Sequence, residues 1–119
     1  MQNQGDRYEE LAASWLLAQG WQILQRNFRC KLGEIDIIAL HHGQLVFVEV
    51  RARSNPRFSS AAASVDRRKQ QKLLRAARFF LQCSTRWQNM PCRFDVLAFD
   101  PRQSDPEPAP RWIRSAFSA

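Results

Sequence analysis

Two acidic residues lie in neighbouring apolar segments, Asp36 in GEIDIIAL and Glu49 in LVFVEVRA. A tight turn at His42 and Gly43 would join these segments as a hairpin, because both residue types tolerate a left-handed backbone. In that register Asp36 lies directly opposite Glu49, with Cβ atoms about 4.5–5.5 Å apart. Like charges so close destabilise a sheet unless a cation neutralises them. Mg²⁺ binds carboxylates together with waters and phosphate oxygens, so the pair predicts a metal site suited to phosphodiester cleavage.

The same residues also have a purely structural interpretation. Asp36 and Glu49 would then be ordinary strand acids that Arg51 or Arg53 neutralises. Glu34 lies opposite Arg51 in the same register, and we expect a plain cross-strand ion pair between them. Both interpretations of the acidic pair stay open from these residues alone.

Strand alternation assigns the side chains of this hairpin to two faces. One face carries the charged residues together with two apolar ones: Glu34, Asp36, Ile38, Phe47, Glu49 and Arg51. The other face is apolar: Ile35, Ile37, Val46, Val48 and Val50. His41 and His42 are interpreted as solvent-exposed turn residues rather than metal ligands, because adjacent side chains in a turn diverge.

Hydrophobic periodicity predicts the elements that position these residues. Helical spacing predicts a first helix over 6–19 and a second from a cap at Ser64 to about residue 82. The second helix is expected to bury four side chains: Leu73, Ala76, Ala77 and Phe80. Four segments are predicted as strands: residues 21–29, 34–40, 44–52 and 93–99. Loops are expected over 53–63 and in the proline-rich stretch 101–110, and residues 112–117 add an edge strand or a packing tail.

Length and composition limit the class of protein. The 119 residues fit one domain, residues 1–119, with an α/β fold built on a central sheet. No apolar stretch approaches the roughly 20 residues that cross a bilayer, and the polar N-terminus lacks the pattern of a signal peptide. We therefore expect a cytoplasmic protein without membrane association. Cys30, Cys83 and Cys92 do not have disulfide or zinc-knuckle spacing and are expected as reduced, mostly buried thiols.

The charge of the chain favours a polyanionic partner. Eighteen Lys and Arg residues against 11 Asp and Glu residues give a net charge of +7. Six cations without an intervening acid occur in the predicted second helix: Arg67, Arg68, Lys69, Lys72, Arg75 and Arg78. Such a run can be a solvated helix face, but its self-repulsion favours nucleic acid as the partner. The predicted nucleic-acid contacts are Arg53, Arg67, Arg68, Lys69, Lys72 and Arg75.

Several segments together resemble the bacterial YraN-like family. They are YEELAASWL, LQRNFR, GEIDIIA, LVFVEVRARS, RRKQQKLLRAARFFL, RFDVLAFD and the final SAF, and they cover nearly the whole chain. YraN-like proteins in turn resemble archaeal Holliday junction resolvases and PD-(D/E)XK nucleases. The resemblance implies a restriction-endonuclease-like core with a mixed central sheet flanked by helices, in the order α-β-β-β-α-β(-β). It also implies Mg²⁺- or Mn²⁺-dependent cleavage of DNA, including branched DNA, and makes a homodimer plausible.

The resemblance assigns roles to residues that match the nuclease motif. Asp36 and Glu49 match its two strand acids, and Glu9 matches an additional acid on the first helix, so these three are the expected metal ligands. Arg51 occupies the position of the motif's lysine. A guanidinium stays protonated, so Arg51 can only orient water or stabilise phosphate charge. Lys69 is an alternative base, or else a residue whose stem covers the edge of the core while its amine reaches solvent.

Glu9 also has a structural interpretation, because Asp6 followed by Glu9 three residues later has the spacing of an N-cap and a capping acid. This capping role is compatible with metal binding by Glu9. The departure at Arg51 also supports a second function, a nucleic-acid-binding module that retains the fold without catalysis. An adaptor that docks an acidic protein surface is a third. The leading expectation is a metal-dependent endonuclease with Glu9, Asp36, Glu49 and Arg51 in the catalytic site.

Overall fold

The computed structural model describes residues 4–52, 65–100, 106 and 108–117. The helices are α1 (Gln4–Ala18), α2 (Arg67–Cys83) and a short 3-10 turn, η2 (Thr85–Trp87). The strands are β1 (Gln22–Cys30), β2 (Gly33–His41), β3 (Gln44–Ala52), β4 (Cys92–Phe99) and β5 (Arg111–Phe117). The order α-β-β-β-α-β-β confirms the predicted mixed α/β fold, and the last segment is an edge strand.

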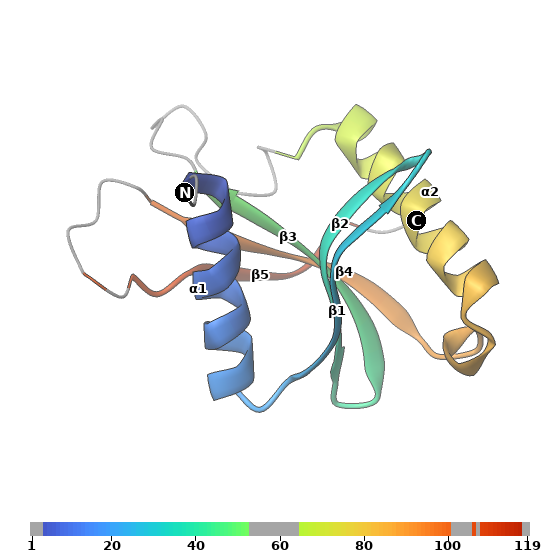
Figure 1. Ribbon diagram of the computed structural model, residues 1–119, viewed down its shortest axis with the longest axis horizontal. Coiled ribbons are helices and arrows are strands. Elements are labelled where there is room, and N and C mark those ends of the chain that lie inside the picture. The colour runs from blue at the N-terminus through green and yellow to red at the C-terminus, as the bar shows by residue number, and fades with distance from the viewer. Residues whose placement is uncertain (1–3, 53–64, 101–105, 107, 118–119) are drawn as a thin grey trace.

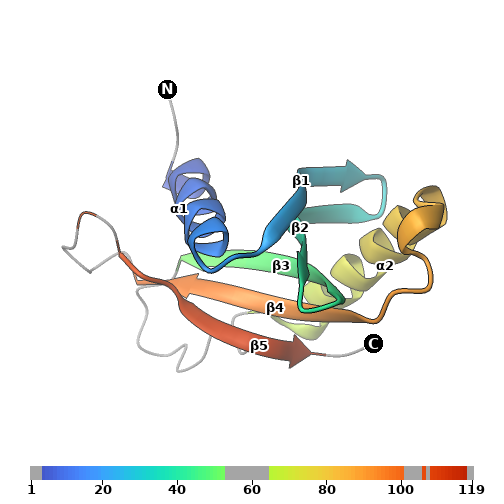
Figure 2. The same ribbon diagram turned by 90° about the horizontal axis from the view of Figure 1, so that it is seen from below.

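The five strands form one mixed sheet in the order β1-β2-β3-β4-β5. β3 and β4 run parallel, and the other neighbours are antiparallel. Figure 2 shows β1 and β2 bending away from the plane of β3, β4 and β5, with α1 and α2 on either side of the bend. Helix α1 contacts β1 and β3, whereas α2 contacts mainly β2.

Two apolar cores lie on opposite faces of the sheet, because alternate residues of β3 enter different cores. Val46 and Val48 pack with the α1 side chains Tyr8, Ala12, Ala13 and Leu16. Phe47 packs with the α2 side chains Leu73, Ala76, Ala77 and Phe80, which confirms the predicted buried face of this helix. Each helix is thus held to the sheet by one stripe of its residues.

The hairpin turn between β2 and β3 lies where the sequence places it. His42 and Gly43 have φ angles of 48° and 76°, and the pairs run from His41 with Gln44 to Ile37 with Val48. The ladder with β3 ends there, whereas β2 continues to pair with β1 as far as Gly33. The far part of the β1–β2 hairpin, which we call the hairpin arm (residues 28–35), leaves β3 and contacts α2 (Figure 1).

The bend corrects one predicted face assignment. Ile35 was expected beside Ile37 in the core of Val46 and Val48, but it packs in the α2 core instead. Strand β1 carries a bulge between Ile23 and Gln25. Pairing of the arm with β1 stays in one register beyond this bulge, so Ile35 changes core because β2 has left β3 and packs against α2.

Two predicted helix caps are also corrected. The side chain of Asp66 caps α2 by accepting a hydrogen bond from the backbone N–H of Lys69 at 2.8 Å. Ser64, the expected cap, lies outside the described residues. Helix α1 begins at Gln4, so Asp6 lies within its first turn rather than at the N-cap.

The far end of the sheet carries a buried polar network. Arg93 Nε lies 3.1 Å from Asp95 Oδ1, and both residues are buried. Trp112 and the backbone of Ser115 donate to Asp95, which fastens β5 to β4. His41 joins this network through Arg93 at 2.8 Å, so the expectation that His41 is an exposed turn residue is wrong.

Two remaining expectations concern the cysteines and the membrane. The three cysteines are free as expected, but Cys83 and Cys92 are exposed rather than buried. Among the described helices, none is long and apolar enough to cross a membrane.

Candidate active site

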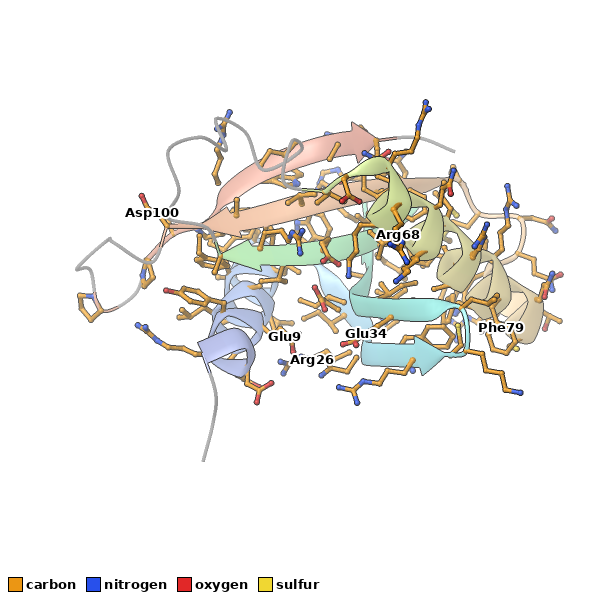
Figure 3. All side chains as sticks on the ribbon, turned by 90° about the horizontal axis from the view of Figure 1, so that it is seen from above. Glu9, Arg26, Glu34, Arg68, Phe79 and Asp100 are labelled. Atoms are coloured by element: carbon orange, nitrogen blue, oxygen red, sulfur yellow. The ribbon has the colours of Figure 1, made fainter. Side chains whose placement is uncertain are left out.

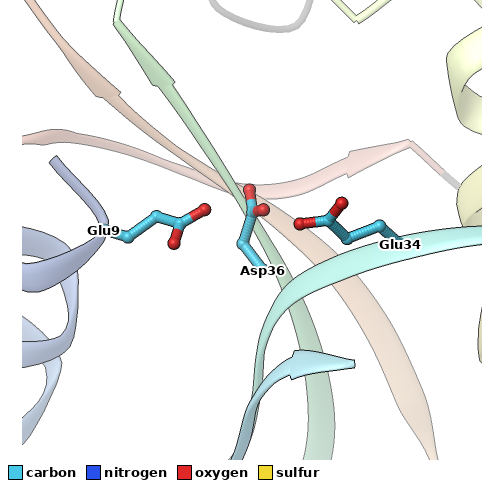
Figure 4. A group of neighbouring side chains, drawn as sticks. All are labelled: Glu9, Glu34 and Asp36. Atoms are coloured by element: carbon cyan, nitrogen blue, oxygen red, sulfur yellow. The ribbon is translucent and has the colours of Figure 1, made fainter. Parts of the chain in front are cut away.

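Three carboxylates meet at the point where β2 parts from β3. Glu9 comes from α1, and Glu34 and Asp36 come from β2 (Figure 4). One oxygen of each lies within 4.8 Å of the others. Glu34 and Asp36 are two residues apart on one strand, and α1 brings Glu9 toward them by packing Tyr8 and Ala12 into the core.

Asp36 also joins the two strands where their ladder has ended. Its Oδ2 accepts a hydrogen bond from the backbone N–H of Val50 at 2.8 Å. The side chain thus substitutes for the missing backbone pair and holds β2 beside β3. This contact fixes the position of Asp36 next to Glu49.

Glu49 is the most buried acid of the site, with 5% of its surface exposed. Its Oε1 lies 3.7 Å from Arg51 Nη1 and 3.6 Å from Lys69 Nζ. Its Oε2 is buried and accepts no hydrogen bond from any described residue. A buried polar atom without a partner costs free energy, so a cation or a hydrogen-bond donor at this oxygen would stabilise the site.

The acids disfavour one another's charge. Burial, and next the charge of Asp36, raise the pKa of Glu49 to about 8, against the opposing effect of Lys69 and Arg51. Burial and then Asp36, with a smaller effect of Glu34, raise the pKa of Glu9 to about 7. Burial and mutual repulsion thus both favour the protonated form of Glu9 and Glu49 when no cation is bound.

These residues fit a divalent cation. Carboxylate oxygens are the hard ligands that Mg²⁺ and Mn²⁺ prefer. The unpartnered Oε2 of Glu49 and the mutual repulsion of the acids are both relieved by a positive ion. The donor set and its electrostatics thus suit the metal that the nuclease resemblance implies.

The predicted geometry of the site is partly wrong. Asp36 and Glu49 do not form a ladder pair, because pairing of β2 with β3 stops at Ile37 and Val48. Glu34 does not pair with Arg51; its ion pair is with Arg29, at 3.7 Å. Glu34 instead belongs to the carboxylate group, which the sequence interpretation missed; its spacing of two residues from Asp36 on one strand face is the signal that could have found it.

An open basic pocket adjoins Glu49. It has a volume of about 410 Å³ and is lined by Arg51, Asp66, Arg68, Lys69 and Lys72. Arg51 and Lys69 both lie in this pocket and against Glu49, so the pocket and the acids share a border. Its position at the N-terminus of α2 further favours an anion.

Only some of the predicted nucleic-acid contacts line this pocket. Arg68, Lys69 and Lys72 line it, whereas Arg67 and Arg75 are exposed on α2 without lining it. Arg53 lies outside the described residues. The cations of α2 are thus divided between the pocket and the outer surface of the helix.

The family match covers every acid of the site and all of α2. Residues 8–99 match the uncharacterised protein family UPF0102. The chain belongs to this family. It is the YraN-like family that the motifs indicated. A UPF0102 protein of Pseudomonas syringae pv. syringae is 43% identical over 99% of this chain and 95% of its own length. UPF0102 proteins of Alcanivorax borkumensis (45% identical; 97% and 91% covered) and Saccharophagus degradans (47%; 96% and 92%) are similarly close.

Proposed function

We propose that this UPF0102 protein is a divalent-metal-dependent endonuclease that cleaves phosphodiester bonds of DNA. The observation that carries the proposal is the border between the carboxylate site and the basic pocket. Lys69 and Arg51 line the pocket and lie within 4 Å of Glu49 Oε1. A phosphate held in the pocket would therefore lie beside the acids that hold the metal.

Each residue has a role that its chemistry permits. Glu9, Glu34 and Asp36 would hold Mg²⁺ or Mn²⁺ together with Glu49, which is not part of that close group but lies beside Asp36. Such an ion supplies an activated water and polarises a phosphoryl oxygen. Arg51 and Lys69 would hold the phosphate and stabilise the charge that develops on it. Arg51 acts only as a fixed positive charge, because its guanidinium does not release a proton.

Cleavage of labelled DNA tests the proposal. Four-way, flapped and plain duplex DNA are incubated with Mg²⁺, with Mn²⁺ or with EDTA. Cleavage is expected only with the metals, and Asp36→Asn and Glu49→Gln should reduce it at least about 100-fold. Glu10→Gln is the matched control, because Glu10 is an exposed neighbour on α1 whose ion pair is with Arg26. Equal cleavage by Asp36→Asn, Glu49→Gln and wild type would exclude this site.

The second candidate function is a nucleic-acid-binding protein without catalysis. Arg51, which stands in the position of the nuclease motif's lysine, is the observation that favours it. Such a protein would bind DNA equally in EDTA and with metal, would leave every substrate intact, and would be indifferent to Asp36→Asn. The same assay therefore separates the two functions.

A further inference from the structure

One side of α2 carries a continuous exposed stripe, which we call the α2 stripe: Arg68, Lys72, Arg75 and Phe79. Spacings of four, three and four residues place these side chains on one side of a helix. The stripe is about 16 Å long at the helical rise per residue. Figure 3 shows Arg68 toward the start of α2 and Phe79 toward its end.

The stripe connects two different surfaces. Its first half enters the basic pocket, since Arg68 and Lys72 line that pocket. Its other end is apolar: Phe79 is 39% exposed, and Leu32 in the turn of the hairpin arm is 46% exposed. A cationic path thus leads from the candidate active site to an exposed aromatic ring.

The aromatic end is held in place by the hairpin arm. The rings of Phe79 and Phe28 lie 6.3 Å apart. Gly33 approaches α2 so closely that a Cβ there would lie 3.0 Å from the backbone oxygen of Lys72. The arm and helix therefore form one surface, on which Phe79 packs beside Phe28 and leaves part of its ring exposed.

The charges of the stripe favour a polynucleotide as its occupant. In the part of the chain that the structure describes, Arg68, Lys72 and Arg75 form no ion pair. Neighbouring cations repel one another, and a chain of phosphates removes that repulsion. A duplex backbone offers no base face that could stack on the exposed ring of Phe79, whereas an unpaired base stacks on such a ring.

We propose that the α2 stripe guides a single DNA strand from the basic pocket to Phe79, where an unpaired base stacks on the ring. The substrate class is then DNA with unpaired nucleotides beside the scissile bond, such as a flap or fork, rather than blunt duplex. The inference rests on the proposed function only in assuming that the strand is cleaved beside the pocket. Binding along the stripe requires no cleavage.

Binding in EDTA by fluorescence anisotropy tests this inference separately from cleavage. The labelled probes are an oligothymidine, a flapped duplex and a blunt duplex, measured with the full chain. Wild type should bind the first two more tightly than the blunt duplex. Phe79→Ala should weaken only the binding of the oligothymidine and the flap, by about 5- to 150-fold, and Phe79→Trp should retain it. Leu17→Ala, another exposed apolar residue but on α1, is the matched control and should change nothing.

Charge variants and stability measurements complete the design. Lys72→Ala should weaken strand binding more than Arg7→Ala, because Arg7 is an exposed cation on α1, away from the stripe. Thermal unfolding of each variant shows that a binding loss is not a loss of fold. Equal affinity for blunt duplex and flap, an equal loss of both with Phe79→Ala, or binding to anionic lipid vesicles but to no DNA would each overturn the inference. Metal-dependent cleavage without this preference would leave the proposed function intact.

Discussion

Asp36 shows how one carboxylate can serve structure and chemistry at the residue scale. Its Oδ2 accepts from Val50 and holds β2 to β3 beyond their ladder. Burial, and next the charge of Asp36, raise the pKa of both Glu9 and Glu49. An amide in its place would keep an acceptor for Val50 and remove the repulsion.

Asp36→Asn is therefore expected to stabilise the metal-free protein. At pH 8 in EDTA its free energy of unfolding should rise by up to about 1 kcal/mol, the size of a close like-charge interaction. For a chain of this length that corresponds to about 4 °C in Tm. Differential scanning calorimetry measures it, with Glu10→Gln as a control that leaves the acidic site intact. A lower Tm for Asp36→Asn would show that the charge itself, rather than the acceptor, stabilises the fold.

At the scale of elements, the site depends on where the hairpin arm leaves the sheet. Glu34 lies in the arm, Asp36 directly follows the arm, and Gly33 of the arm contacts α2. Helix α2 in turn supplies Lys69 to Glu49. A change in the packing of the arm against the helix thus affects acids and cations together.

Gly33→Ala is expected to loosen this junction. The added Cβ would lie 3.0 Å from the Lys72 backbone oxygen, which cannot rotate away as a side chain can. We expect a loss of about 1–3 kcal/mol in the free energy of unfolding, the usual cost of overpacking. Urea denaturation measures the loss, and Lys31→Ala, an exposed change in the same turn, should have little effect. If Gly33→Ala unfolds at the same urea concentration as wild type, the arm is not held by this contact.

At the scale of the whole molecule, a strongly basic chain surrounds a small acidic site. A net charge of +7 attracts polyanions, whereas the carboxylates at the bend of the sheet repel them. A bound divalent cation would remove this conflict. The stability of the molecule should therefore depend on pH and on metal in a linked manner.

Without metal, the acidic site should lose stability as pH rises. Glu9 and Glu49 have pKa values of about 7 and about 8 when folded, against an ordinary value of 4.5. The folded state thus binds more protons than the unfolded state between about pH 4.5 and pH 8, so their contribution declines across that range. Burial lowers the pKa of His41 from 6.5, so the contribution of His41 to stability rises with pH below that value. The difference in the free energy of unfolding between wild type and Asp36→Asn, followed across this pH range, isolates the contribution of the acidic site.

Metal should reverse this trend. Mn²⁺ is expected to raise the Tm of wild type more at pH 8 than at pH 5, because protons compete for the carboxylates at low pH. Thermal unfolding with Mn²⁺ and with EDTA at both pH values measures the effect. Asp36→Asn should abolish most of the gain. An equal gain at both pH values would indicate that the ion binds elsewhere.

Sequence by itself determined the local features of this protein. The order of helices and strands, the hairpin turn at His42 and Gly43, and the buried face of α2 follow from periodicity and turn chemistry, which act over a few residues. The family follows from motifs along the chain. The proximity of Asp36 and Glu49 was also predictable, although its cause was not.

Tertiary structure alone decided where the β2–β3 ladder stops. Beyond Ile37 and Val48 the arm packs against α2, and no local pattern encodes this contact between remote segments. It moved Ile35 to the other core and brought Glu34 to Glu9 instead of Arg51. The distant packing of α2 likewise decided that Lys69 meets Glu49, because contacts between remote segments follow from the shape of the whole core.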